Sequence, residues 1–313
     1  MPPTTSFTLC DTDVAASTAF SALKSIYCLV IDCEGLDLGR DPGQLSLLTI
    51  GTVPTNETSS PLVFVFDILR LSTESLQPIF GLLSSPTYTK IVFDGRMDYS
   101  ALYHEHGVEL VGVLDLQLAA IQSPINTYAM LVKFMGPAMA ENKREYKKVR
   151  MLPGLGYCIS VCKVSSERGD GKLKSELSSS DSLRSGAHSL PIVDHRQWLV
   201  RPLPARYLEY AANDAILIAK LYKEFDTRRY ITKRLSEQSA RYIALFKGAK
   251  KSPGNGTFYS NAFLPLDILT YNVRNPRKAC SGCNRQLSLQ CFPTTEGAVY
   301  CFVCKAVLAK AAQ

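Results

Sequence analysis

Two acidic residues, Asp32 and Glu34, directly follow an apolar run at residues 27–31. The run predicts a buried strand, and alternate side chains of a strand point to the same face. We therefore expect Asp32 and Glu34 on one face and Cys33 on the other. Two close carboxylates repel each other unless a proton or a cation lies between them, and hard oxygen ligands favour Mg²⁺ or Mn²⁺. The pair predicts a divalent-metal site at a strand end, although its spacing is also typical of a solvated loop entry.

A tyrosine and an aspartate, Tyr210 and Asp214, lie four residues apart in a predicted helix at 204–226. Side chains with this spacing share one helix face. A carboxylate there is able to hold a metal ion, while the phenol reaches a water molecule beside it. The alternative is a partly buried tyrosine that only hydrogen-bonds to its neighbour.

Two aspartates, Asp94 and Asp98, lie between these pairs, where a short strand, a glycine turn and a helix start follow one another. Either is able to complete a carboxylate cluster. Asp94 is also typical of a turn or cap residue. Spacing alone does not choose between them.

In their order and context these three segments resemble the exonuclease motifs of the DEDD superfamily, in the tyrosine-bearing subgroup that contains ribonuclease D and the exonuclease domain of Werner-type helicases. The segment at 198–214 is similar to the Arg-Pro-Leu stretch and Tyr-x-x-x-Asp of ribonuclease D-like proteins, and 113–119 resembles the segment that follows their second motif. The resemblance covers about residues 20–225. It makes Asp98, rather than Asp94, the second-motif aspartate.

The resemblance implies a role for each residue and a reaction. Asp32, Glu34 and Asp214 would hold one Mg²⁺ or Mn²⁺ ion, and Asp32 and Asp98 would hold a second ion, while Tyr210 would orient the attacking water. Two ions in such a site stabilise the entering and leaving oxygens of a phosphoryl displacement. The expected activity is 3′-5′ exonuclease cleavage of single-stranded RNA or DNA, with RNA favoured by family analogy, and with release of nucleoside 5′-monophosphates. The alternative is a catalytically inactive nucleic-acid-binding or adaptor protein on the same fold.

The predicted elements are consistent with the ribonuclease H-like fold that this family implies. Early strands precede strands that alternate with helices, which predicts an α/β fold with a mixed sheet flanked by helices. The expected strands are 26–32, 45–52, 62–68, 89–93 and 110–114. The expected helices are 12–24, 73–83, 97–106, 115–134 and 204–226.

Four cysteines near the C-terminus have the spacing of a structural zinc site: Cys280, Cys283, Cys301 and Cys304. A segment of about 34 residues is too short to stabilise itself by burial alone, whereas zinc contributes on the order of 10 to 16 kcal/mol. We expect one Zn²⁺, with Cys291 left over. The module resembles treble-clef and zinc-ribbon fingers. Nucleic-acid binding, protein docking and a purely structural cap all remain open for it.

Charge is divided unevenly along the 313 residues. Residues 1–222 hold 20 Lys and Arg against 23 Asp and Glu, a net charge of −3, while residues 223–313 hold 15 against 5, a net charge of +10. Clustered positive charge suits phosphate binding, although a solvated helix face is the alternative. The two clusters are Arg228, Arg229, Lys233, Arg234 and Arg241, predicted to share a helix, and Lys143, Arg144, Lys147, Lys148 and Arg150.

Composition indicates an intracellular protein of the nucleus or cytoplasm. We find no long apolar run and no secretion signal, which predicts no membrane partner, and ten cysteines without such a signal favour thiols and metal ligands over disulfides. We expect an exonuclease domain at 1–247 with a flexible insertion at about 164–190, a linker at 248–270 and the zinc module at 271–313. His195, in a predicted loop before Trp198, receives no role.

Overall fold

A computed structural model describes most of the chain, namely residues 6–54, 60–125, 127–136, 146, 148–164, 193–252, 261–294 and 297–312. It divides into two compact units. The first comprises residues 1–120 and 154–252, and the second comprises residues 121–153 and 253–313. This division by contacts groups residues 121–153, which the sequence assigned to the exonuclease domain, with the C-terminal residues. Most of the predicted insertion lies outside the described residues.

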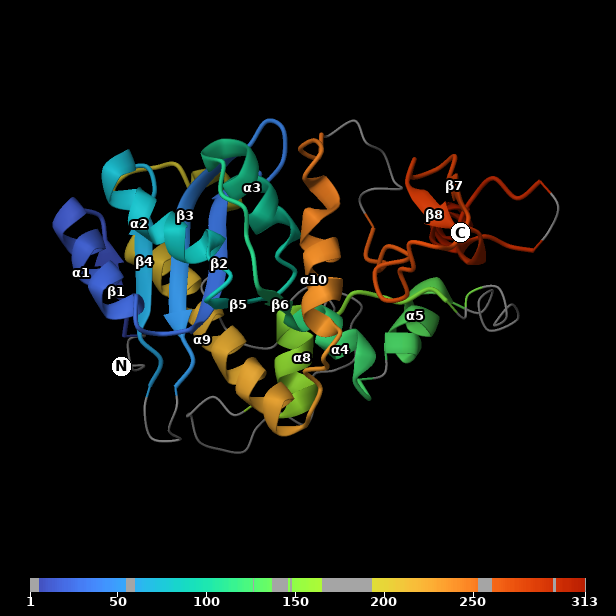
Figure 1. Cartoon of the computed structure of the whole chain (residues 1–313), viewed down its shortest axis with the longest axis horizontal. Coiled ribbons are helices and arrows are strands. Elements are labelled where there is room, and N and C mark those ends of the chain that lie inside the picture. Colours follow the sequence, from blue (N-terminus) through green and yellow to red (C-terminus); the bar gives the residue numbers. More distant parts are fainter. Residues whose placement is uncertain are drawn as a thin grey trace. The chain divides into compact units, whose positions relative to one another are not determined.

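The first unit is built on a six-stranded mixed sheet (Figure 1). The strand order is β1, β4, β3, β2, β5 and β6. Strand β3 pairs antiparallel with both β2 and β4, while β2, β5 and β6 run parallel. The strands are β1 (Thr8–Cys10), β2 (Cys28–Leu36), β3 (Gln44–Thr52), β4 (Val63–Asp67), β5 (Thr89–Val92) and β6 (Val113–Asp115).

Helices cover both faces of the sheet, which confirms the predicted α/β class. The apolar core on one face joins β2 to the first three helices through residues such as Ile31, Leu76 and Leu102. On the other face α9 contacts β2, β3 and β4. The helices of this unit are α1 (Asp13–Leu23), α2 (Thr73–Ser84), α3 (Arg96–His106), α4 (Leu116–Gln122, which ends at the boundary of the unit), α8 (Leu155–Cys162), α9 (Ala205–Thr227) and α10 (Leu235–Ile243).

Two predictions about the elements are wrong in detail. The expected helix at 115–134 is interrupted, because α4 ends at Gln122 and α5 (Thr127–Met135) begins after Pro124, a residue that cannot continue a helix hydrogen-bond ladder. Strand β1 was not expected, since three residues are too few to show a period. It pairs with β4 at the edge of the sheet.

The second unit contains α5 and a small C-terminal module. A hairpin of β7 (Arg277–Ala279) and β8 (Gln286–Ser288) precedes α12 (Phe302–Ala311). Asp267 ties the hairpin to the preceding segment, because its carboxylate accepts hydrogen bonds from the Ser288 amide at 2.6 Å and the Ser288 hydroxyl at 2.7 Å. Among the helices of the described residues, none is long and apolar enough to span a membrane.

Candidate active site

Strand β2 directs its alternate residues to opposite sides of the sheet. Ile31 and Cys33 belong to the core on the side of α1 and α2. On the other side, a Cβ atom at Gly51 in β3 would lie 3.5 Å from the Cβ atoms of both Val30 and Ala215, so Val30 faces α9. Asp32 follows Val30 with the strand period and faces α9 as well. Glu34 continues on this side at the end of the strand.

A β-bulge between Glu34 and Gly35 shifts the register of β2 against β3, and pairing then continues with Gly35 opposite Leu45 and Leu36 opposite Gln44. A Cβ atom at Gly35 would lie 2.2 Å from the backbone oxygen of Gln44 and 3.2 Å from the Cα of Leu45. Only glycine permits this close approach of two backbones. Gly35 therefore allows the bulge that directly follows Glu34.

Asp98 lies in the first turn of α3 and is bound directly to β2. Its Oδ1 accepts a hydrogen bond of 2.8 Å from the backbone N–H of Cys33. The contact joins residues 65 positions apart and places a buried carboxylate beside the strand position between Asp32 and Glu34. The structure thus brings Asp98 to the pair that the sequence singled out.

Asp94 lies instead in the turn before α3. Its backbone φ is 58°, and its carboxylate forms a two-point ion pair with Arg96 at 2.5 and 2.7 Å. The turn is held by Asp115, whose carboxylate accepts hydrogen bonds from the backbone N–H groups of Asp94, Gly95 and Gln117 at 3.2, 3.0 and 2.9 Å. Sequence reasoning gave Asp115 no role, although it lies in the segment 113–119 that supported the resemblance. It fixes the turn from which Asp98 projects.

Helix α9 supplies Tyr210 and Asp214. One carboxylate oxygen from each of Asp214, Asp32 and Glu34 lies within 4.8 Å of the others. Burial and then the charges of Asp214, Glu34 and Asp32 raise the pKa of the Tyr210 phenol. Tyr210 therefore lies beside the carboxylate cluster and not beside Asp214 alone.

The cluster concentrates negative charge in a poorly solvated place. Burial first, and then the charges of Glu34, Asp98 and Asp214, raise the pKa of Asp32 well above its usual value. Burial likewise raises the pKa of Asp98 to about 7 and that of Asp214 to about 6. The Oδ2 atom of Asp32 is buried without a hydrogen-bond partner. Close carboxylates with an unpaired buried oxygen suit hard divalent cations, so the residues present fit Mg²⁺ or Mn²⁺.

The basic residues at the end of α9 do not share one helix, contrary to the prediction. Helix α9 ends at Thr227 and α10 begins at Leu235, so Arg228, Arg229 and Lys233 lie between the two helices. Arg228 pairs with Glu224 and Arg241 pairs with Glu237, each at 2.5 Å. These two ion pairs reduce the free positive charge.

The other predicted basic cluster is only partly described. Lys143, Arg144 and Lys147 lie outside the described residues. Lys148 donates a hydrogen bond to the Gln290 carbonyl at 2.7 Å, and Arg150 donates one to the Val149 carbonyl at 3.2 Å.

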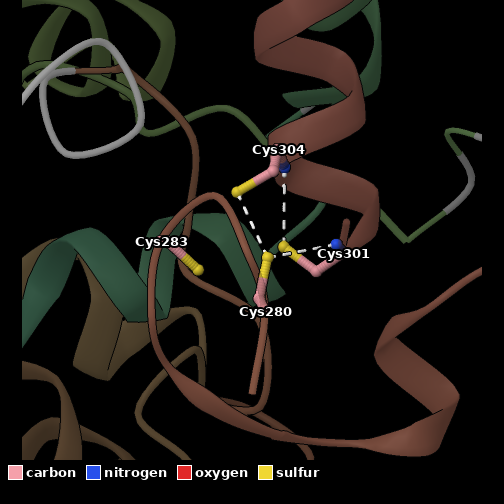
Figure 2. A group of neighbouring side chains, drawn as sticks. All are labelled: Cys280, Cys283, Cys301 and Cys304. Atoms are coloured by element: carbon pink, nitrogen blue, oxygen red, sulfur yellow. Dashed lines mark hydrogen bonds between the residues drawn. The ribbon is translucent and has the colours of Figure 1, made fainter. Parts of the chain in front are cut away.

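The second unit holds a separate candidate metal site in which all four predicted cysteines meet (Figure 2). Their sulfur atoms lie within 4.8 Å of one another, and those of Cys280 and Cys304 are 3.6 Å apart. Tetrahedral zinc with Zn–S bonds of about 2.3 Å requires sulfurs roughly 3.8 Å apart, which fits. Cys301 caps the N-terminus of α12 and Cys304 lies in its first turn. Cys291 is separate, since its thiol donates to Asp267 at 3.0 Å and burial raises its pKa to about 12.

Comparison with known proteins agrees with this geometry. Residues 7–140 match the model of a 3′-5′ exonuclease family. That range contains Asp32, Glu34 and Asp98, whereas Tyr210 and Asp214 lie beyond it. None of the curated protein sequences compared with this chain matches it.

A solved structure of RNase D shares the fold, and two further solved structures are similar to this chain. RNase D of Trypanosoma brucei, in complex with RNA U12, is 22% identical over 90% of this chain and 83% of its own, with a TM-score of 0.57. The catalytic core of Trypanosoma brucei RRP6 is 18% identical over 78% of this chain and 53% of its own, with a TM-score of 0.47. Escherichia coli RNase D is 17% identical over 82% and 54%, with a TM-score of 0.44. The first of these likenesses establishes an RNase D-like fold for this chain.

Proposed function

We propose that the protein is a divalent-metal-dependent 3′-5′ exonuclease that acts on single-stranded RNA and releases nucleoside 5′-monophosphates. The observation that carries the proposal is the convergence of Asp32, Glu34 and Asp214 within 4.8 Å, with Asp98 hydrogen-bonded to the same strand and Tyr210 beside Asp214. The exonuclease match over residues 7–140 supports the reaction class. RNA is proposed because the similar RNase D of Trypanosoma brucei was solved with RNA.

The roles proposed for the acidic residues are those of the family resemblance, and the contacts are consistent with them. Asp32, Glu34 and Asp214 would hold one divalent ion, and Asp32 and Asp98 would hold a second. When bound, the ions neutralise phosphate charge and favour ionisation of the attacking water. The hydrogen bond from the Cys33 backbone N–H holds the Asp98 carboxylate in place, so the carboxylates need little rearrangement to accept cations.

Tyr210 would orient the attacking water. Its pKa is raised above its usual value by burial and by the surrounding carboxylates, so the phenol stays protonated at neutral pH. A protonated phenol accepts a hydrogen bond from water through its oxygen and is able to donate its own proton to the neighbouring Asp214. It therefore positions a water molecule without acting as the base.

The C-terminal module completes the proposal. We assign one structural Zn²⁺ to Cys280, Cys283, Cys301 and Cys304, because thiolates with this spacing suit zinc. We retain the limits 1–247 for the exonuclease domain, 248–270 for the linker and 271–313 for the zinc module. The module would bind nucleic acid or a protein partner, and deletion of residues 271–313 separates these roles from degradation.

The activity is tested with a 5′-labelled single-stranded RNA, a DNA of the same sequence, and an RNA blocked at its 3′ end. With Mg²⁺ or Mn²⁺ the open RNA should shorten stepwise and release nucleoside 5′-monophosphates, while the blocked RNA stays intact. Asp32→Asn should abolish turnover. Tyr210→Phe should lower kcat on the order of 10²-fold, whereas Tyr222→Phe on the same helix is the matched control and should change little.

Two outcomes would contradict the proposal. If the wild type shortens no strand with any divalent ion yet still binds RNA, the catalytically inactive nucleic-acid-binding or adaptor protein is the correct assignment. If cleavage occurs within the blocked strand, the enzyme is an endonuclease.

A further inference from the structure

A group of aromatic side chains surrounds Tyr210 on the side of the segment that leads into α9. Trp198 is fully buried, and its ring meets the ring of Tyr207 edge to face, with 4.9 Å between the ring centroids. The ring centroid of Tyr210 is 6.2 Å from that of Trp198. His195 lies in a short 3-10 helix, η2 (His195–Gln197), which contacts β2. Its ring is perpendicular to that of Tyr210 at 6.4 Å. His195 is thus the exposed member of a cluster that includes the proposed water-orienting phenol.

The hydrogen bond between Trp198 and His195 determines where the imidazole carries its proton. The indole Nε1 of Trp198 lies 3.2 Å from Nδ1 of His195. Indole N–H groups only donate, so Nδ1 must accept through its lone pair, and the neutral ring then carries its proton on Nε2. Within the described part of the chain, Nε2 has no hydrogen-bond partner. The neutral side chain therefore presents an N–H donor beside Tyr210.

The backbone of Trp198 is anchored to the sheet that bears the carboxylates. Its carbonyl accepts hydrogen bonds from the Ser46 hydroxyl at 2.6 Å and from Arg201 at 2.8 Å. Arg201 forms a two-point ion pair with Asp67 at 2.6 and 2.8 Å and also donates to Ser46 at 2.8 Å. Ser46 adjoins the β3 residue that pairs with Glu34. These contacts hold the indole in place relative to the site.

We propose that His195 binds the nucleic-acid strand, with its Nε2–H donating to a phosphate oxygen of the nucleotides beside Tyr210, and that Trp198 is the positioning residue that sets this tautomer. The proposal rests on the proposed exonuclease function. Phosphate and sugar oxygens receive most hydrogen bonds in protein–nucleic acid complexes. A bond to an anionic oxygen is stronger than one between neutral groups. A donor beside the phenol would therefore add affinity for the strand without taking part in bond cleavage.

The tautomer is tested first, by ¹⁵N NMR of the histidine rings, with His195 assigned through His195→Gln. The free wild type should show the Nε2–H form. Trp198→Phe, which keeps an aromatic ring and removes the indole donor, should give a mixture of both tautomers. Addition of a short RNA to the Asp32→Asn protein should shift the His195 Nε2–H signal. A wild-type ring protonated on Nδ1, or an unchanged signal at saturating RNA, would overturn the inference.

Steady-state kinetics provide the second test and separate contact from folding. His195→Ala should raise KM for RNA roughly tenfold, the usual effect of losing one hydrogen bond to a charged group, and leave kcat within about threefold. His195→Gln retains a side-chain N–H donor and should recover part of the loss. His104→Ala, a matched change at another exposed histidine, whose Nε2 lies 2.8 Å from the Phe246 carbonyl, should leave KM unchanged.

The two proposals fail in different ways. If the wild-type protein degrades no strand, both the exonuclease proposal and this inference are wrong. If the wild type degrades RNA with the same KM as His195→Ala, the inference is wrong and the exonuclease proposal stands. A fall in kcat without a change in KM would place His195 in the chemical step and would also overturn the proposed contact.

Discussion

Asp214→Asn is expected to stabilise the metal-free protein at alkaline pH while it abolishes activity. Burial raises the pKa of Asp214 from 3.8 to about 6. A carboxyl group with a raised pKa binds its proton more tightly in the folded state, so the fold is most stable when the group is protonated and loses stability as the pH rises through about 6. Asparagine has a similar shape, keeps a side-chain oxygen as an acceptor beside Tyr210, and carries no charge.

The magnitude follows from the two pKa values. A tenfold change in proton affinity corresponds to about 1.4 kcal/mol, so the ionised carboxylate costs about 3 kcal/mol at pH 8, and about half of this at pH 5. For a unit of about 200 residues, 1 kcal/mol changes the melting temperature by about 2 to 4 °C. We therefore expect metal-free Asp214→Asn to melt about 6 to 12 °C above the wild type at pH 8, with a smaller difference at pH 5.

The assay is thermal unfolding followed by circular dichroism, with stoichiometric zinc retained and Mg²⁺ removed. Mg²⁺ should then raise the melting temperature of the wild type more than that of Asp214→Asn, because the cation replaces the repulsion among carboxylates by attraction. Asp226→Asn, at an exposed position of the same helix, is the matched control and should be neutral. If Asp214→Asn melts below the wild type at pH 8 without Mg²⁺, or if the difference does not depend on pH, the argument from burial of the Asp214 carboxylate is wrong.

Three further changes test other parts of the structure. Asp67→Ala removes the buried partner of the half-buried Arg201 and should cost about 3 kcal/mol in a denaturant titration. Asp11→Ala breaks a more exposed ion pair and should cost under about 1 kcal/mol, and equal losses would contradict the assigned burial. Cys280→Ser should lower bound zinc, measured by atomic emission, from about one equivalent to near zero. The C-terminal module should become sensitive to proteolysis, while the first unit keeps its melting transition. Full zinc binding by this variant would refute the ligand set. Gly35→Ala forces a side chain against a backbone carbonyl, so it should destabilise the fold by about 1 to 3 kcal/mol. It should also weaken Mg²⁺ binding measured by calorimetry. Unchanged Mg²⁺ binding would show that the bulge does not position Glu34.

Local periodicity was enough to predict most of the first unit. The apolar runs predicted five of its six strands because a buried strand needs only a few consecutive apolar residues. The strand period also placed Asp32 and Glu34 on one face, and the helix period placed Tyr210 above Asp214. The spacing of the four cysteines likewise predicted their cluster, because each Cys-x-x-Cys pair places two thiols of a zinc site in one short turn.

Tertiary structure alone decided the features that depend on distant contacts. Spacing could not choose between Asp94 and Asp98. The family resemblance favoured Asp98, but the hydrogen bond from the Cys33 amide that holds this carboxylate against β2 is visible only in the structure. The proton position on His195 depends on Trp198, whose own place depends on Arg201 and strands far away in the sequence. Repeating patterns report which face of an element is buried, whereas hydrogen bonds between elements depend on how the chain packs. The chain's pattern therefore determined which residues carry the chemistry, and packing determined which of them meet.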